Sequence, residues 1–173
     1  MSSEHRRRPP RLAEVFHTHV SPVYLVTFCA MYRRPILSRH TVHAAFQEYA
    51  ERGATEKAVA VGRYVIMPDH VHLFVCGGDN FDLGFWVRGL KRAMAKAVVV
   101  AAVPAAENDT APVTGATTPE RIWQPGFFDH LLRSSESYAE KWNYVRENPV
   151  RAGLVQLAED WPYQGEIVLI DRV

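Results

Sequence analysis

Residues 59–75, VAVGRYVIMPDHVHLFV, contain the pattern that predicts the fold. Two apolar stretches, 59–67 and 71–75, are rich in β-branched and aromatic residues and lie on either side of Pro68-Asp69. Proline and aspartate are typical of tight turns, so the segment predicts two neighbouring strands joined by a short turn. The glycine pair at 77–78 then ends the second strand.

The sequence before this segment predicts a strand and a helix. Residues 23–30, VYLVTFCA, have the composition of a strand. From Ser38, the predicted N-cap, four residues recur with helical spacing before Gly53, namely Val42, Phe46, Tyr49 and Ala50. The first two elements are therefore a strand and a helix.

The sequence after it predicts a second helix, a fourth strand and a third helix. Apolar residues keep helical spacing over 83–98, and 126–133 resembles a strand. The third helix begins at 134–136 and is ended by Pro149 near Asn148. The order is that of an α+β, ferredoxin-like split βαβ unit, an antiparallel sheet with helices packed on one face and an added C-terminal helix.

Length and composition favour one domain and exclude several classes. The chain has 173 residues, of which 47% are hydrophobic and 23% charged, which is typical of a globular domain and not of disorder or coiled coil. The longest apolar run, 97–103, is far shorter than the roughly 20 residues that cross a bilayer. We expect no membrane partner. Cys29 and Cys76 lie in apolar runs, which favours reduced core thiols.

The domain organisation follows from changes in composition along the chain. Residues 1–20 form a basic N-terminal arm without the apolar region of a secretory signal, so we expect a cytoplasmic protein. The domain spans 21–160 and includes a flexible Pro-, Ala- and Thr-rich insertion at 103–120. Residues 161–173 are a C-terminal tail.

Basic residues are clustered although the net charge is only +1. Arg88, Arg92 and Lys96 repeat at i, i+4 and i+8 on the predicted second helix, away from its apolar residues. They could contact a phosphate backbone. The alternative is a solubilising helix face.

A pair of histidines lies on the second strand of the deciding segment. Alternation places His70 and His72 on one face and Val71 on the other. Two imidazoles on one face can chelate a metal ion. His17 and His19 have the same spacing but lie in the basic arm, with no carboxylate or amide placed to complete a ligand shell, so we expect them to have no role.

The third helix has two faces of different character. Its apolar face consists of Tyr138, Trp142 and Val145 and must contact the core. On another face, Tyr144 and Asn148 lie one turn apart beside Lys141. Taken alone, this is also the pattern of an amphipathic helix with a half-exposed tyrosine.

Three motifs together resemble a known family. They are YVIMPDHVHL at 64–73, WQ at 123–124 and YVRENPVRAGLV at 144–155. Their order and spacing resemble the single-tyrosine HUH transposases, and in particular the REP-associated tyrosine transposase branch. The resemblance covers about 23–155. The insertion at 103–120 is longer than expected for the family, and the N-terminal arm has no counterpart in it.

The resemblance implies a set of site residues. His70 and His72 would bind a divalent metal, Mg²⁺ or Mn²⁺, with Asn148 as third ligand where related insertion-sequence enzymes usually have Gln. Tyr144 would be the nucleophile. Lys141 and Arg151 would join Arg88, Arg92 and Lys96 as candidate DNA contacts, although Lys141 could equally belong to a solvated face.

The implied activity is metal-dependent nicking and joining of single-stranded DNA beside hairpins, through a 5′-phosphotyrosine. Because the covalent bond retains the phosphodiester energy, no nucleotide cofactor is expected. The expected partner is single-stranded or hairpin DNA, and we favour a monomer. One alternative is a domesticated regulator that binds hairpins without mobilising them. Another is a metal hydrolase of small phosphoesters, which would leave Tyr144 without a role.

Overall fold

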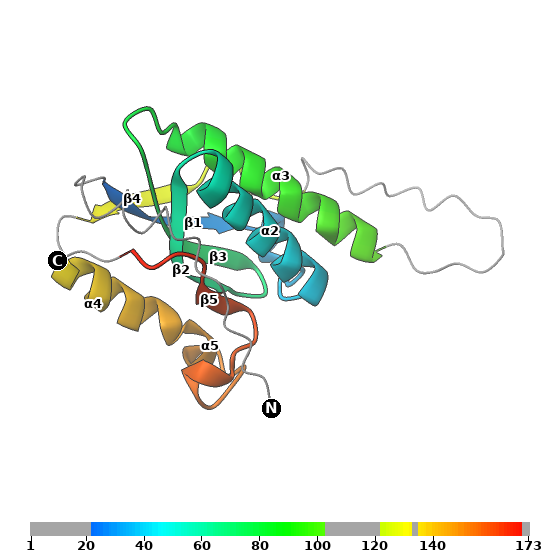
Figure 1. Cartoon of the computed structure of the whole chain (residues 1–173). Coiled ribbons are helices and arrows are strands. Elements are labelled where there is room, and N and C mark those ends of the chain that lie inside the picture. Colours follow the sequence, from blue (N-terminus) through cyan, green and yellow to red (C-terminus); the bar gives the residue numbers. More distant parts are fainter. Residues whose placement is uncertain (1–21, 103–121, 133–134, 171–173) are drawn as a thin grey trace, which may run out of the picture.

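The computed structural model describes residues 22–102, 122–132 and 135–170 of the chain, without the side chains of 135–137. At its centre lies a five-stranded antiparallel sheet with the order β4-β1-β3-β2-β5 (Figure 1). The strands are β1 (Val23–Cys29), β2 (Val59–Ile66), β3 (His70–Gly77), β4 (Phe128–Leu132) and β5 (Gln164–Glu166). The helices are α2 (His40–Glu56), α3 (Leu83–Ala102), α4 (Ser135–Arg146) and α5 (Asn148–Arg151).

The predicted α+β fold is confirmed. The order β1-α2-β2-β3-α3-β4 is that of the split βαβ unit, with α4 added after it. The backbone N–H of Met67 donates to the carbonyl of His70 at 2.8 Å and closes the turn at Pro68-Asp69. The predicted N-cap at Ser38 is wrong, because α2 begins at His40 with Arg39 as N-cap. Leu37, fully buried and bonded through its N–H to the carbonyl of Pro68 at 2.8 Å, fixes the chain just before that start.

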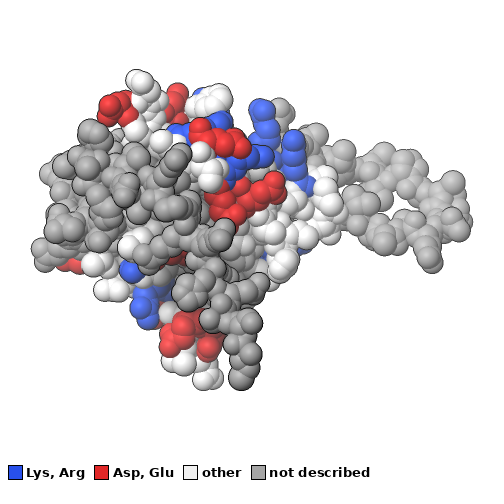
Figure 2. All heavy atoms as spheres, viewed as in Figure 1, with Lys and Arg blue, Asp and Glu red and all other residues white. Residues whose placement is uncertain are grey.

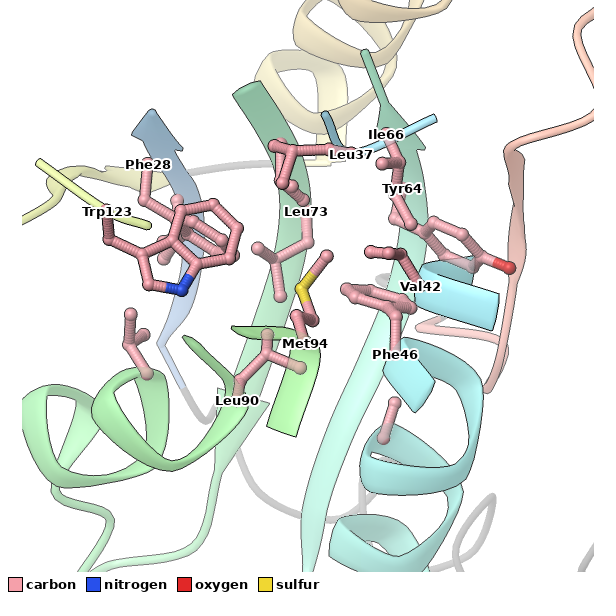
Figure 3. Close-up of a cluster of buried hydrophobic side chains, with 14 of the residues drawn as sticks. Phe28, Leu37, Val42, Phe46, Tyr64, Ile66, Leu73, Leu90, Met94 and Trp123 are labelled. Atoms are coloured by element: carbon pink, nitrogen blue, oxygen red, sulfur yellow. The ribbon is translucent and has the colours of Figure 1, made fainter. Parts of the chain in front are cut away.

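Helices α2 and α3 cover one face of the sheet (Figure 1). Apolar residues of both helices and of the central strands form the main core, which Figure 3 shows with Phe28, Phe46, Leu73, Leu90 and Met94 among its members. These five side chains are at most 1% exposed. Burial of this amount of apolar surface is the main source of stability in such a domain.

Helix α4 covers the opposite face, so the fold has three layers. The ring centroid of Tyr138 lies 4.4 Å from that of Phe74 on β3. Tyr138 is 9% exposed, Val145 is 2% exposed and Trp142 is partly buried, which confirms the predicted apolar face of this helix. The chain thus returns across the face of the sheet that α2 and α3 leave open.

The end of α4 differs from the prediction. The helix ends at Arg146, and Asn148 begins a separate short helix, α5, in which Pro149 stands in the first turn. Proline has no N–H for the preceding turn and its ring disfavours a continuous helix, but it suits the first turn of a new one. Asn148 therefore opens a second helix and does not close the first.

Strand β5 was not predicted from the sequence. Gln164–Glu166 pair with 63–65 at the outer edge of β2, and Val168 and Ile170 are each only 8% exposed. Residues 161–170, expected to be tail, therefore form part of the domain. Three residues of sequence Gln-Gly-Glu carry no apolar alternation that could indicate a strand.

The turn after β1 carries unusual backbone geometry. Tyr32 and Arg33 in the short 3-10 segment Met31–Arg33 have φ of 55° and 54°, in the left-handed region. For residues other than glycine this conformation costs about 1–3 kcal/mol each. The surrounding hydrogen bonds must hold the turn in place.

Several expectations lie outside the described residues: the basic arm at 1–20 with His17 and His19, the insertion at 103–120 and the last residues of the tail. Cys29 and Cys76 are free thiols, as expected. Within the described part of the chain, no helix is both long enough and apolar enough to cross a membrane.

Candidate active site

The histidine pair lies on the face of the sheet that α4 crosses. On β3, Val71 and Leu73 are fully buried beneath α2 and α3, whereas His70 and His72 alternate with them on the other face. The two imidazole centroids are 4.8 Å apart and the rings are nearly perpendicular, at 89°. Phe74, next on this face, contacts Tyr138 of α4.

Each imidazole is bonded to the protein through Nδ1. His72 Nδ1 lies 2.7 Å from the hydroxyl of Thr27, its cross-strand neighbour on β1, and His70 Nδ1 lies 2.6 Å from Asp69 Oδ1. An ionised carboxylate only accepts, so His70 carries its proton on Nδ1 and keeps a lone pair on Nε2. The Thr27 hydroxyl can accept in the same way from His72. This is the arrangement of metal-binding histidines.

Arg33 fixes the carboxylate that orients His70. Its Nε lies 2.7 Å from Asp69 Oδ2, and its Nη1 donates to Cys29 Sγ at 2.8 Å. Sequence reasoning missed Thr27, Asp69 and Arg33. Asp69 could have been found because it precedes His70 directly, but Thr27 and Arg33 reach the site only through the β1–β3 register and the turn after β1.

Both histidines are neutral at neutral pH. Burial, reinforced by the positive charges of His70, Arg33 and Arg151, lowers the pKa of His72 to about 3, and Asp69 opposes this shift only weakly. Burial also lowers the pKa of His70, although its hydrogen bond to Asp69 acts in the other direction. Neutral imidazole is the form that binds metal.

Arg151 connects the predicted nucleophile and the predicted third ligand. Its guanidinium carbon lies 4.3 Å from the ring centroid of Tyr144, a cation–π contact, and its Nη2 donates to the Tyr144 carbonyl at 2.7 Å and to Asn148 Oδ1. Its charge also acts on His72. Arg151 therefore links the end of α4 to α5, and Tyr144 remains 64% exposed.

The donor set fits a divalent cation that accepts both imidazole nitrogen and amide oxygen. The amide nitrogen of Asn148 is buried with no hydrogen-bond partner, and its oxygen has a second lone pair besides the one used by Arg151. Among the described residues, no three His, Cys, Asp or Glu side chains are grouped to hold a metal. A cation on His70 and His72 would need an amide or substrate oxygen to complete its shell, and the Asn148 amide, which Arg151 holds, is the oxygen donor that the sequence predicted.

The basic residues of α3 lie in the opposite layer. Arg88, Arg92 and Lys96 are all exposed, as their spacing predicted. The sheet separates them from the histidine pair. Figure 2 shows basic side chains beside acidic ones in the region of α2 and α3. Lys141, by contrast, is half-buried on α4, one turn before Tyr144.

The Trp123-Gln124 motif supports the turn after β1. Trp123 packs edge-on against Phe28, with ring centroids 5.0 Å apart, and pairs with Ala30 in an isolated bridge. Gln124 donates through its backbone N–H to the carbonyl of Cys29 at 2.9 Å. Both residues hold the end of β1 in place.

Comparisons with known proteins agree with this geometry. A family model described as "Transposase IS200 like" matches residues 19–148. The chain is 30% identical over 98 residues to a REP-associated tyrosine transposase of Haemophilus influenzae, covering 57% of this chain and 53% of that protein. It is 26% identical over 111 residues to a REP-associated tyrosine transposase of Escherichia coli, covering 62% and 54%. The chain thus spans about half the length of these curated relatives.

A solved structure shares the fold. It is a REP-associated tyrosine transposase bound to a REP hairpin, with a TM-score of 0.61 and 20% sequence identity, covering 94% of this chain and 82% of that one. At 20% sequence identity this similarity establishes the fold alone, and any inference about chemistry must come from the residues of the site.

Proposed function

The chain belongs to the IS200-like transposase family, and from this premise we propose that it nicks and rejoins single-stranded DNA beside hairpins through a covalent bond to Tyr144. The observation that carries the proposal is the grouping made by Arg151. It contacts the Tyr144 ring at the end of α4 and the Asn148 amide at the start of α5, and its charge lowers the pKa of His72, which supports a site formed by these two residues and the pair of neutral histidines.

His70, His72 and Asn148 would hold the divalent cation, Mg²⁺ or Mn²⁺. When bound, the cation stabilises negative charge that develops on the non-bridging oxygens of the scissile phosphate. Asp69 and Thr27 keep both imidazoles in the tautomer that offers Nε2. The guanidinium of Arg151 is positioned to bind a phosphate oxygen beside Tyr144.

The Tyr144 phenol is the nucleophile. A bond forms from its oxygen to phosphorus, and the bond from phosphorus to the 3′ oxygen breaks. The phenol proton passes to water at this exposed side chain, and the departing 3′ oxygen takes a proton from water. The products are a 5′-phosphotyrosine and a free 3′-hydroxyl. A second 3′-hydroxyl can reverse the step and join strands without a nucleotide cofactor.

The test uses a pool of labelled hairpin oligonucleotides with randomised single-stranded flanks, incubated with Mg²⁺ or Mn²⁺. We expect a covalent adduct on a denaturing gel, and mass spectrometry of the nuclease-trimmed adduct should place the nucleotide on Tyr144. Tyr144→Phe should keep DNA binding and lose the adduct. Tyr138→Phe is the matched control and should stay active, because this buried hydroxyl only accepts from the Arg63 N–H at 3.3 Å.

The same assay tests the metal ligands. The adduct should be abolished by His70→Ala or His72→Ala and reduced by Asn148→Ala. It should be unchanged in the control variants His17→Ala and His19→Ala. A nucleotide on another tyrosine, normal nicking by Tyr144→Phe, or full activity in excess chelator would contradict the proposal. Hairpin binding by the wild-type protein without any adduct would favour a regulator that has lost the chemistry.

A further inference from the structure

The turn after β1 holds two successive residues in a backbone conformation that they disfavour. Tyr32 has φ 55° and ψ 23°, and Arg33 has φ 54°. Glycine or asparagine would adopt this left-handed geometry at lower cost. The interactions of the side chains at these two positions should therefore compensate the backbone strain.

Hydrogen bonds on both sides keep the turn in this geometry. The Ala30 N–H donates to the Asp69 carbonyl and the Met31 N–H to the Ile122 carbonyl, each at 2.8 Å. On the far side, Leu37 is fully buried and its N–H donates to the Pro68 carbonyl at 2.8 Å. Strain that the neighbouring structure maintains in this way is characteristic of functional sites.

The contacts of Arg33 account for its strained backbone, but Tyr32 makes no contact in the described residues that accounts for its own. Arg33 reaches Asp69, and its Nη2 lies 3.4 Å from His70 Nδ1, so it belongs to the support of the histidine pair. Tyr32 is 86% exposed, the largest value among the large hydrophobic side chains that the structure describes as exposed. Within the described residues its ring makes no aromatic or cation–π contact and its hydroxyl no hydrogen bond, so burial does not compensate its backbone strain.

We propose that Tyr32 is a stacking platform for an unpaired base of the DNA strand whose phosphate binds at His70 and His72. The inference rests on the proposed function. Because Arg33 adjoins His70 and Tyr32 is its chain neighbour, a strand held at the histidines passes beside the exposed ring. Unpaired bases expose a π-face that stacks on aromatic side chains whatever the base, whereas paired bases of a stem do not. Tyr32 thus favours single-stranded DNA at this end of the site.

The test measures binding by fluorescence anisotropy with two hairpins that share a stem, one with a single-stranded deoxyadenosine tail and one with an abasic tail of equal length. Tyr32→Ala should weaken binding to the deoxyadenosine tail about 5- to 100-fold, and Tyr32→Phe by less than about twofold. On the abasic tail, wild type and Tyr32→Ala should bind equally. Phe85→Ala, which removes a 62% exposed ring from α3 in the opposite layer, is the matched control and should change neither affinity.

A second variant separates stacking from folding. Tyr32→Gly removes the ring and relieves the strain, so its thermal midpoint should equal or exceed that of wild type while its affinity falls as in Tyr32→Ala. A lower midpoint together with lost binding would indicate a structural role and overturn the inference.

Two other results would overturn it. One is equal binding of wild type and Tyr32→Ala to the deoxyadenosine tail, and the other is an equal loss on both tails. Wild-type protein that binds neither hairpin would overturn the proposed function together with this inference, whereas wild-type binding that Tyr32→Ala leaves unchanged overturns the inference alone.

Discussion

Among single residues, Asp69 has the most specific role in supporting the site, because its two oxygens bond His70 and Arg33. A carboxylate behind a metal-binding histidine fixes the ring and increases its basicity, and its loss typically lowers metal affinity about 10- to 100-fold. Asp69→Ala should therefore weaken Mn²⁺ binding to the DNA-free protein by about 10- to 100-fold in calorimetry.

The control for Asp69→Ala is the same substitution at Asp82, an aspartate that caps a helix and does not contact the histidine pair. Asp82 accepts the Phe85 N–H at 2.7 Å and caps α3. Asp82→Ala should lower stability by about 1 kcal/mol and leave Mn²⁺ affinity unchanged. Equal Mn²⁺ affinity of Asp69→Ala and wild type would remove Asp69 from the support of the site.

His43 gives the fold a pH dependence that is separate from the active site. Burial, and then the charge of His40, lower its pKa below 6.5 in the folded chain. Between the folded and unfolded pKa values the unfolded chain binds more protons, so stability is complete above 6.5 and decreases as the pH falls below it. The thermal midpoint should fall from about pH 8 to about pH 5, and less steeply in His43→Gln.

This substitution isolates one histidine. Glutamine can still bond the Tyr64 hydroxyl, which His43 Nε2 contacts at 2.8 Å, and the lowered pKa values of His70 and His72 remain in both proteins. An unchanged pH slope in His43→Gln would show that His43 titrates alike in the folded and unfolded chains.

Among the elements, α3 carries the exposed basic row farthest from the histidine face. If DNA also contacts this row, each phosphate contributes about 0.7 to the slope of log affinity against log salt for single strands. The triple variant of Arg88, Arg92 and Lys96 to alanine should then lose about 2 from that slope and keep its chemistry at saturating DNA. Arg151→Ala should by comparison impair adduct formation as well as binding.

The salt series has a clear negative outcome. An unchanged slope in the triple variant would indicate that the row is a solvated helix face, for which the neighbouring acidic side chains in Figure 2 are also typical.

The elements also show how far sequence reasoning extends. The four long strands and α2, α3 and α4 were predicted because their apolar periodicity is long enough to distinguish strand from helix. Three features were missed or misplaced: β5, the break between α4 and α5, and the N-cap of α2. β5 and the N-cap of α2 depend on contacts between distant segments, such as the pairing of Gln164–Glu166 with β2, that no local pattern encodes, whereas the break follows from Pro149.

Less of the site geometry could be predicted. Alternation placed His70 and His72 on one face, as the structure has them, whereas Tyr144 and Asn148, expected one turn apart on one helix, lie on two helices, α4 and α5. Thr27 and Arg33 could not be predicted, because they meet the histidines only through sheet register and a strained turn.

At the scale of the whole molecule, α4 packs on the sheet of its own chain, through Tyr138 on Phe74 and through Val145 beside Val65. The proposed nucleophile and the histidines would therefore act within one chain, and we predict an active monomer. A mixture of His72→Ala and Tyr144→Phe proteins should form no adduct, because neither chain contains a complete site. An adduct in the mixture, with dimers in light scattering, would show that the tyrosine helix acts in a partner.

The alternation of side chains along β3 affects how this strand can change in evolution. Substitutions at Val71 or Leu73 would affect folding and those at His70 or His72 would affect the proposed chemistry, although the codons interleave. A lineage in which cleavage is no longer selected can lose its histidines by drift while the neighbouring positions stay under purifying selection. A single inserted codon in this strand would exchange the two sets of side chains, and would eliminate both properties in one generation.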